Sequence, residues 1–104
     1  MDFNEYQKLA HQTAVYPIDL AKYYLTLGLT GESGEVANKI KKEIRDREPV
    51  SEEEIKSELG DVLWYLSELA LTYGINLEEI AKSNVEKLKG RKMRGTLRGS
   101  GDHR

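Results

Sequence analysis

The 104-residue sequence contains no cysteine and only two histidines, His11 and His103. It therefore offers no disulfide, no thiolate metal site and no cysteine nucleophile, a composition that fits the cytoplasm. Two histidines are too few for a multi-histidine zinc site. No apolar run approaches the roughly 18 residues of a membrane span, and the acidic start Met1–Glu5 does not resemble a secretory signal. We expect a cytoplasmic protein without a membrane partner.

Charge is plentiful but uneven along the chain. There are 18 acidic and 16 basic residues, and residues 90–104 carry +4 while residues 1–89 carry −6. The C-terminal stretch is also rich in glycine, so we divide the chain into a domain over residues 1–93 and a basic, glycine-rich tail over residues 94–104. The acidic body lacks the basic stripe that nucleic-acid binding requires, so we expect no nucleic-acid partner.

Apolar periodicity and capping signals predict four helices and no strand. The first begins at Asp2 and ends before Pro17, the second runs from Asp19 to Asp46 with a break among its glycines, the third from Ser51 to Gly74, and the fourth from Asn76 to Gly90. Short connections between such helices favour an all-α four-helix bundle.

The third predicted helix is apolar on two sides. One broad face is centred on Leu59, while Trp64 and Leu71 lie on the other side. A chain of this size is too small to bury both apolar faces within one subunit, so contact with a partner subunit is the simplest explanation. We expect a homodimer or a homotetramer.

Pairs of acidic residues at helical spacing recur on two of the helices. Glu58 and Asp61 project as neighbours from the third helix, and Glu32 and Glu35 flank the apolar face of the second. Four carboxylates crowded near a core repel one another and require a cation or protons. Oxygen-only ligands suit Mg²⁺, with Mn²⁺ as the alternative, and such an ion binds substrate phosphates and activates water.

Acidic pairs at this spacing are also common on solvated helix faces, which is the ordinary alternative. Three glycines beside the acids favour a site, because glycine is costly inside a helix and lets a ligand or helix approach the backbone. They are Gly31, Gly34 and Gly60.

Two segments, Gly28–Val36 and Glu58–Leu66, resemble the two halves of the motif of MazG-like nucleotide pyrophosphohydrolases, members of the all-α NTP pyrophosphatase superfamily. The motif is ExxE, a spacer and ExxD, and here the spacer is 22 residues. The resemblance implies an oligomeric helical bundle with active sites near subunit contacts. It also implies Mg²⁺-dependent cleavage of a nucleoside triphosphate between the α- and β-phosphates, in nucleotide-pool housekeeping. The implied catalytic metal ligands are Glu32, Glu35, Glu58 and Asp61.

The last predicted helix carries the family's Asn-x-x-Lys-x-x-x-Arg pattern as Asn84, Lys87 and Arg91. The resemblance implies that these residues bind substrate, with Lys39 as a weaker phosphate ligand. Without the resemblance, a solvated basic helix end and an ordinary surface Lys39–Glu35 pair are the more common explanations.

Two other functions remain open. Phosphoribosyl-ATP pyrophosphohydrolase shares the superfamily, and a non-enzymatic helical interaction module would use the basic tail. The tail itself either closes over the triphosphate or is a flexible arm. A di-iron bundle is excluded, because no histidine stands three residues after a glutamate.

Overall fold

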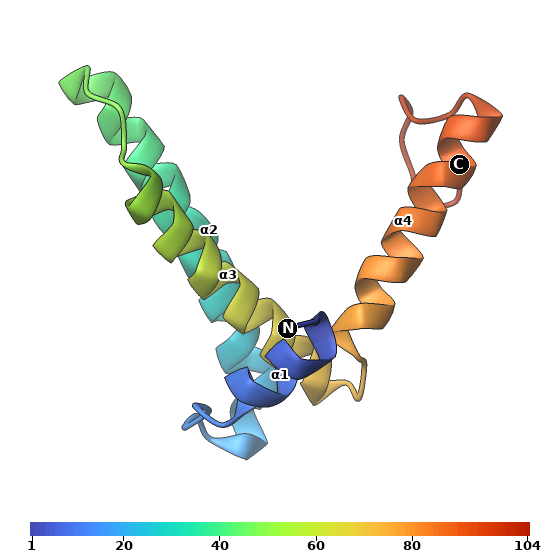
Figure 1. Cartoon of the computed structure of the whole chain (residues 1–104), viewed down its shortest axis with the longest axis horizontal. Coiled ribbons are helices and arrows are strands. Elements are labelled where there is room, and N and C mark those ends of the chain that lie inside the picture. Colours follow the sequence, from blue (N-terminus) through green and yellow to red (C-terminus); the bar gives the residue numbers. More distant parts are fainter.

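The computed structural model describes residues 1–104 and contains only helices (Figure 1). In chain order they are α1 (Phe3–His11), the short 3₁₀ helix η1 (Ile18–Leu20), α2 (Ala21–Asp46), α3 (Glu52–Thr72) and α4 (Leu77–Arg94). The predicted all-α class with four α-helices is confirmed. None of these helices has the length and apolar character to cross a membrane.

Local capping chemistry sets several of the helix ends as predicted. The Asp2 side chain accepts a 2.8 Å hydrogen bond from the Glu5 amide, and Ser51 accepts one of 3.2 Å from the Glu54 amide. Gly74, just beyond the end of α3, has a φ of 68°, in the left-handed region that glycine enters most easily.

Three predictions about the course and ends of the helices are wrong. First, α2 runs through its glycines without a break for 26 residues, because packing along α3 outweighs their low helix propensity. Second, Asp19 lies within η1, and Leu20, the N-cap of α2, provides no side-chain cap. Third, α4 continues past Gly90 and ends at Gly95, whose φ is 72°.

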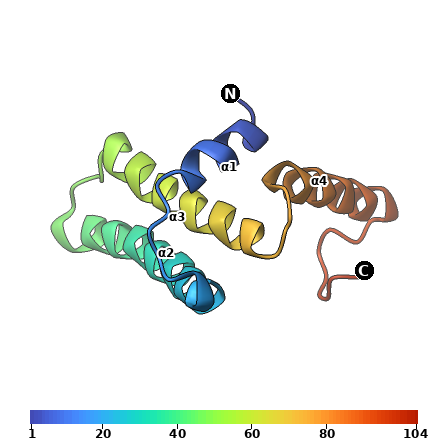
Figure 2. The same ribbon diagram turned by 90° about the horizontal axis from the view of Figure 1, so that it is seen from below.

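The four helices do not close into one bundle within the chain. Helices α2 and α3 lie side by side as a hairpin, α1 crosses its foot, and α4 points away, so that the chain forms a V (Figures 1 and 2). Helix α4 contacts α1 and α3 but not α2. The radius of gyration is 16.5 Å, whereas a compact chain of this length has about 13 Å.

Gln7 joins the foot of the hairpin to the start of α4. Its side-chain amide donates to the backbone oxygens of Ser67 and Ile75, and its oxygen accepts from the Leu77 amide. Gln7 is 5% exposed, so its side-chain amide has little access to water. The three bonds satisfy both N–H groups of the side chain and one of the two lone pairs on its oxygen. Gln7 thus fixes the direction in which α4 leaves.

Part of the face of α3 predicted to be core is exposed, although Ala70 on the same face is buried. Trp64, expected on the partner-facing side, is covered by α1, where its indole nitrogen donates to the Ala10 carbonyl and the Thr13 hydroxyl. Leu59 and Tyr73, on the predicted core face, are 51% and 59% exposed. Helix α4 turns away too early to cover this face.

Glu68 lies fully buried on the side of α3 that α1 covers. Its Oε1 accepts hydrogen bonds from the Tyr16 hydroxyl at 2.9 Å and from His11 Nδ1 at 3.0 Å. Burial and the bond to Glu68 raise the pKa of Tyr16 to about 12. These contacts connect α1 and the segment after it to α3 across more than 50 residues of chain.

Gly28 sets how closely the two long helices approach. A Cβ at this position would fall on the Tyr65 ring. That ring lies 6.2 Å from Tyr24 and 5.0 Å from Trp64, measured between centroids, so it has little room to move. No atom outside the local backbone lies within 4 Å of a Cβ built at Gly34, further along the same helix.

We therefore expect Gly28→Ala to destabilise the fold by about 1–2 kcal/mol, because overpacking exceeds the gain in helix propensity. Gly34→Ala is the matched control and should stabilise it by up to about 1 kcal/mol. Urea unfolding of the two variants measures both effects, and a Gly28→Ala protein as stable as the parent would contradict the close contact with Tyr65.

Candidate active site

The hairpin brings three of the four predicted metal ligands together. Glu32 extends from the middle of α2, and Glu58 and Asp61 extend from the facing part of α3. One carboxylate oxygen from each lies within 4.8 Å of the other two. The convergence follows from helix geometry, since Glu58 and Asp61 are one turn apart and Glu32 lies opposite them.

The electrostatics of this cluster are unfavourable without a counter-ion. Burial, followed by the negative charges of Asp61, Glu58 and Glu35, raises the pKa of Glu32. The pKa of Tyr65 is also raised, by burial, by its hydrogen bond to Tyr24 and by the charges of Glu32 and Asp61. The neighbouring carboxylates thus make ionisation of Glu32 more costly.

The residues present fit a hard divalent cation. All three groups offer oxygen, which Mg²⁺ and Mn²⁺ prefer over nitrogen or sulfur. Their separation lets a single ion reach all three oxygens, and neither histidine is part of the cluster. An acidic cluster able to hold a metal ion is therefore present.

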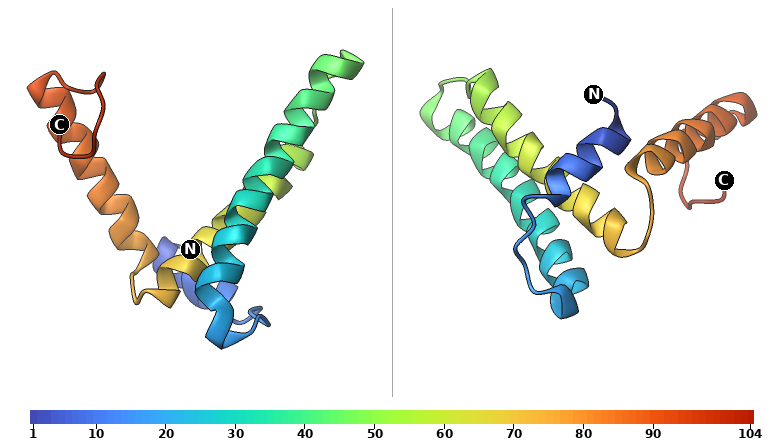
Figure 3. Two further views of the ribbon diagram at one scale, coloured as in Figure 1. Left: turned by 180° about the vertical axis from the view of Figure 1, so that it is seen from behind. Right: turned by 60° about the horizontal axis from the view of Figure 1, so that its bottom comes forward.

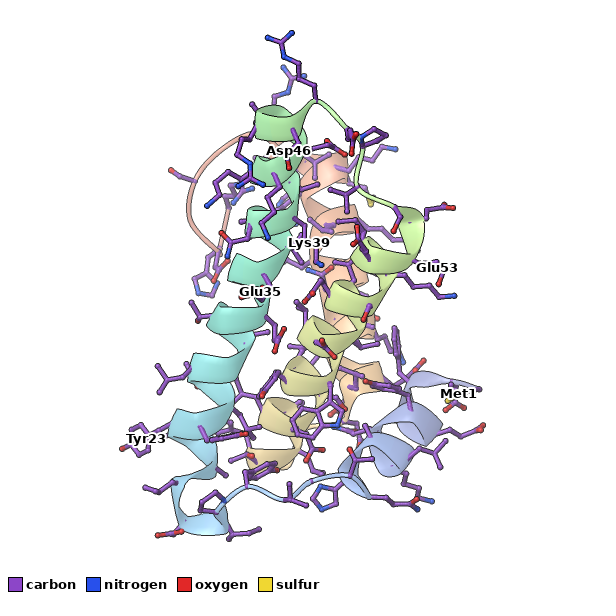
Figure 4. All side chains as sticks on the ribbon, turned by 90° about the vertical axis from the view of Figure 1, so that its left-hand side faces the viewer. Met1, Tyr23, Glu35, Lys39, Asp46 and Glu53 are labelled. Atoms are coloured by element: carbon purple, nitrogen blue, oxygen red, sulfur yellow. The ribbon has the colours of Figure 1, made fainter.

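Lys39 extends from α2 into the space between α2 and α3 (Figure 4). Its Nζ is 3.9 Å from a Glu58 oxygen and 4.0 Å from a Glu54 oxygen. It therefore neutralises part of the negative charge at the edge of the carboxylate group. Its predicted contact with phosphate stays a prediction.

Glu35 and the three glycines beside the acidic residues are exposed to solvent, which the sequence did not predict. Glu35 is exposed and lies outside the group of three carboxylates, although its charge reaches Glu32. Nothing lies within 4 Å of a Cβ built at Gly31, Gly34 or Gly60. A ligand or a second chain has room to approach the backbone there, and Glu35 as a fourth ligand stays a prediction.

The predicted substrate-binding residues lie on the other arm of the V. Asn84 and Lys87 are exposed on α4 and line a surface groove of about 510 Å³. Arg91, in contrast, is buried beneath the C-terminal tail. Because α4 has no contact with α2 (Figure 3), the chain does not bring these residues to the carboxylates.

Tyr65 is the residue near the site that sequence reasoning missed. It is one turn after Asp61, and its ring packs over Gly28 between Tyr24 and Trp64. The signal in the sequence was Gly28 itself, because a glycine inside a helix often marks a close approach by another side chain. Tyr65 thereby forms the apolar boundary of the carboxylate cluster.

Comparison with known proteins identifies relatives of this chain. The family model described as the MazG nucleotide pyrophosphohydrolase domain matches residues 22–95. The chain belongs to the MazG family. It is also 41% identical to the Gene 37 protein of Mycobacterium phage L5, over the full length of both chains. No solved structure matches it.

The MazG match covers all eight predicted site residues and excludes two parts of the chain. Helix α1 lies before the matched region, and the C-terminal tail after Gly95 lies beyond it. The matched region therefore contains both the acidic cluster of the hairpin and the cationic side of α4. The excluded parts are the ones that fix the direction of α4 and cover Arg91.

We expect Glu32→Gln to raise the Tm in the absence of divalent ions, because it removes one of the repelling charges. A gain of about 1 kcal/mol in the free energy of unfolding corresponds to a rise of about 4–8 °C. The same substitution should reduce the rise in Tm that Mg²⁺ or Mn²⁺ produces, since ion binding to the folded state is weakened. Thermal unfolding with and without each ion measures both.

Glu53→Gln is the control, because Glu53 is exposed on α3 and belongs to no cluster (Figure 4). It makes the same change in net charge and should leave the Mg²⁺ response intact. A Glu32→Gln protein with the full Mg²⁺ response would show that the ion binds elsewhere.

Proposed function

We propose that this MazG protein is a Mg²⁺-dependent nucleoside triphosphate pyrophosphohydrolase of the cytoplasmic nucleotide pool. It cleaves a nucleoside or deoxynucleoside triphosphate between the α- and β-phosphates and releases the monophosphate and pyrophosphate. The observation that carries the proposal is the convergence of Glu32, Glu58 and Asp61 within 4.8 Å. Membership of the family supports the reaction class.

The residues of the hairpin would hold the ion and handle the proton. Glu32, Glu58 and Asp61 would bind Mg²⁺, and Glu35, one turn from Glu32, would complete the set. A bound Mg²⁺ supplies positive charge to phosphate oxygens and makes water more acidic. In the hydrolysis, a water oxygen bonds to phosphorus, the α–β anhydride bond breaks, and pyrophosphate leaves. The water proton passes to one of the carboxylates beside the ion.

The cationic side of α4 would bind the rest of the polyphosphate. Lys87 and Arg91 lie one turn apart and present positive charge to phosphate oxygens, while the Asn84 amide can donate to a phosphate or sugar. These groups are separated from the carboxylates within one chain. We therefore propose that α4 of a second copy completes each site.

The open shape of the chain supports assembly into a homodimer or homotetramer. Apolar residues on all three long helices remain exposed, among them Leu27, Ile44, Leu59, Val85 and Leu88. Burial of such residues against a second copy is favourable, and a chain this open buries few residues on its own. The face centred on Leu59 is the part of α3 available for this contact.

Purified protein with Mg²⁺ should convert at least one nucleoside triphosphate to its monophosphate and pyrophosphate. Glu35→Gln and Asp61→Asn should each lower kcat by at least about 100-fold, a loss typical of a ligand or base used in the transition state. Chromatography of the products from a panel of nucleoside triphosphates, deoxynucleoside triphosphates and phosphoribosyl-ATP measures this.

The Glu53→Gln protein is again the matched control and should keep full turnover. Turnover of phosphoribosyl-ATP alone would replace the proposed substrate by the second superfamily activity. If every compound stays intact in the presence of Mg²⁺, the enzymatic proposal is overturned in favour of a helical interaction module.

Mixing two inactive variants tests whether two copies share a site. Asp61→Asn and Lys87→Ala should each be nearly inactive alone. In a mixed dimer, one site receives both changes and the other receives neither, so an equal mixture should regain about one quarter of the parent activity. Activity of the mixture after subunit exchange, with the oligomeric state checked by light scattering, measures this. Absence of any regain in a mixture shown to exchange would place both residues in sites within one chain.

A further inference from the structure

The C-terminal tail is neither extended nor free. After Gly95 ends α4, the chain loops back along the helix, and the Arg104 guanidinium donates to the backbone oxygens of Thr96, Leu97 and Gly101. The Thr96 hydroxyl donates in return to the Arg104 backbone oxygen at 2.8 Å. Residues 95–104, which we name the C-terminal clasp, therefore form a closed loop held largely by bonds to its own backbone.

The clasp places a carboxylate on the cationic side of α4. Asp102 Oδ1 lies 3.7 Å from Lys87 Nζ and 3.6 Å from an Arg91 guanidinium nitrogen. Asp102 is the only acidic residue after Glu86, and within the structure both of its ion pairs are to residues proposed to bind phosphate. A phosphate oxygen bound by the same two cations would occupy the space of this carboxylate.

Backbone oxygens of the clasp also accept hydrogen bonds from the Arg91 guanidinium. One terminal nitrogen donates to the backbone oxygens of Gly101 and Asp102, at 3.4 Å and 2.9 Å. The side chain is 6% exposed, and its buried Nε has no partner. A guanidinium buried in this way does not reach a phosphate until the loop above it moves.

We propose that the C-terminal clasp is a self-inhibiting element, in which Asp102 occupies the Lys87–Arg91 pair until a polyphosphate displaces it. This inference rests on the proposed function for the identity of the displacing ligand. The Asp102 side chain is 82% exposed, so its ion pairs are weak and screened by salt. A polyphosphate carries several charges and can outcompete a single carboxylate.

Tripolyphosphate in the presence of a chelator is the probe, because without divalent ions it reports on the cationic pair and is not hydrolysed. We expect Asp102→Asn to bind it about three- to tenfold more tightly than the parent, the range expected for two exposed ion pairs. The difference should shrink as salt is raised. Titration followed by amide NMR signals of α4 gives both affinities.

Two variants separate the charge of Asp102 from other effects. Asparagine keeps the backbone oxygen that Arg91 uses, and Asp102→Glu, which restores the charge, should return the affinity toward that of the parent. Glu86→Gln removes an equal charge from the exposed surface of α4 and should leave the affinity unchanged.

Hydrogen exchange of the clasp supplies a second readout. Tripolyphosphate should speed exchange of the Thr96 amide in the parent protein, because the displaced loop loses the bond from this amide to the Arg91 carbonyl. Slower exchange on binding, or an Asp102→Asn affinity equal to or weaker than that of the parent, overturns the proposal. Loss of turnover against every triphosphate would overturn the enzymatic function and leave this titration unaffected.

Discussion

Repulsion among the carboxylates of Glu32, Glu58 and Asp61 is the constraint on which the rest of the structure depends. Packing of α2 on α3 brings the three oxygens within 4.8 Å, and burial together with neighbouring charge raises the pKa of Glu32. Lys39 relieves the repulsion only at one edge. The hairpin keeps this arrangement because the contact of Gly28 with Tyr65 and the aromatic rings beside it fix the approach of the helices. The repulsion lowers the stability of the folded chain, and binding of a cation to the three carboxylates would restore it.

The second constraint is the separation of charge between the two arms of the V. The acidic groups lie on the hairpin and the basic groups on α4, whose direction is fixed at its start by the bonds of Gln7. If α4 instead folded onto its own hairpin, Lys87 and Arg91 would neutralise the carboxylates directly, and neither set would remain available to a substrate and its metal ion. Holding the arms apart keeps the acidic and basic groups of one chain from neutralising each other.

Local chemistry made part of this architecture predictable. The caps at Asp2 and Ser51 and the turn at Gly74 depend on residues a few positions apart, and the structure confirms them. The unbroken course of α2 and the cover of Trp64 by α1 depend on contacts between residues distant in sequence. Helical spacing placed Glu58 beside Asp61, but it could not show that Glu32 would be nearer to them than Glu35. That difference depends on the rotation of α2 against α3, which the Gly28–Tyr65 contact helps to set.

The tail shows how a basic, glycine-rich segment can fold back along the helix that precedes it. Its glycines allow the left-handed turns at Gly95 and Gly101. Arg104 then donates to the backbone oxygen of Thr96, and Arg91 of α4 donates to that of Asp102. A guanidinium that bonds carbonyl oxygens keeps its full charge, so the cationic pair of α4 still requires a counter-ion. Asp102 meets that need weakly, through exposed contacts of 3.6 and 3.7 Å. We expect a polyphosphate to replace this weak internal counter-ion, because several charges on one ligand compete with a single carboxylate.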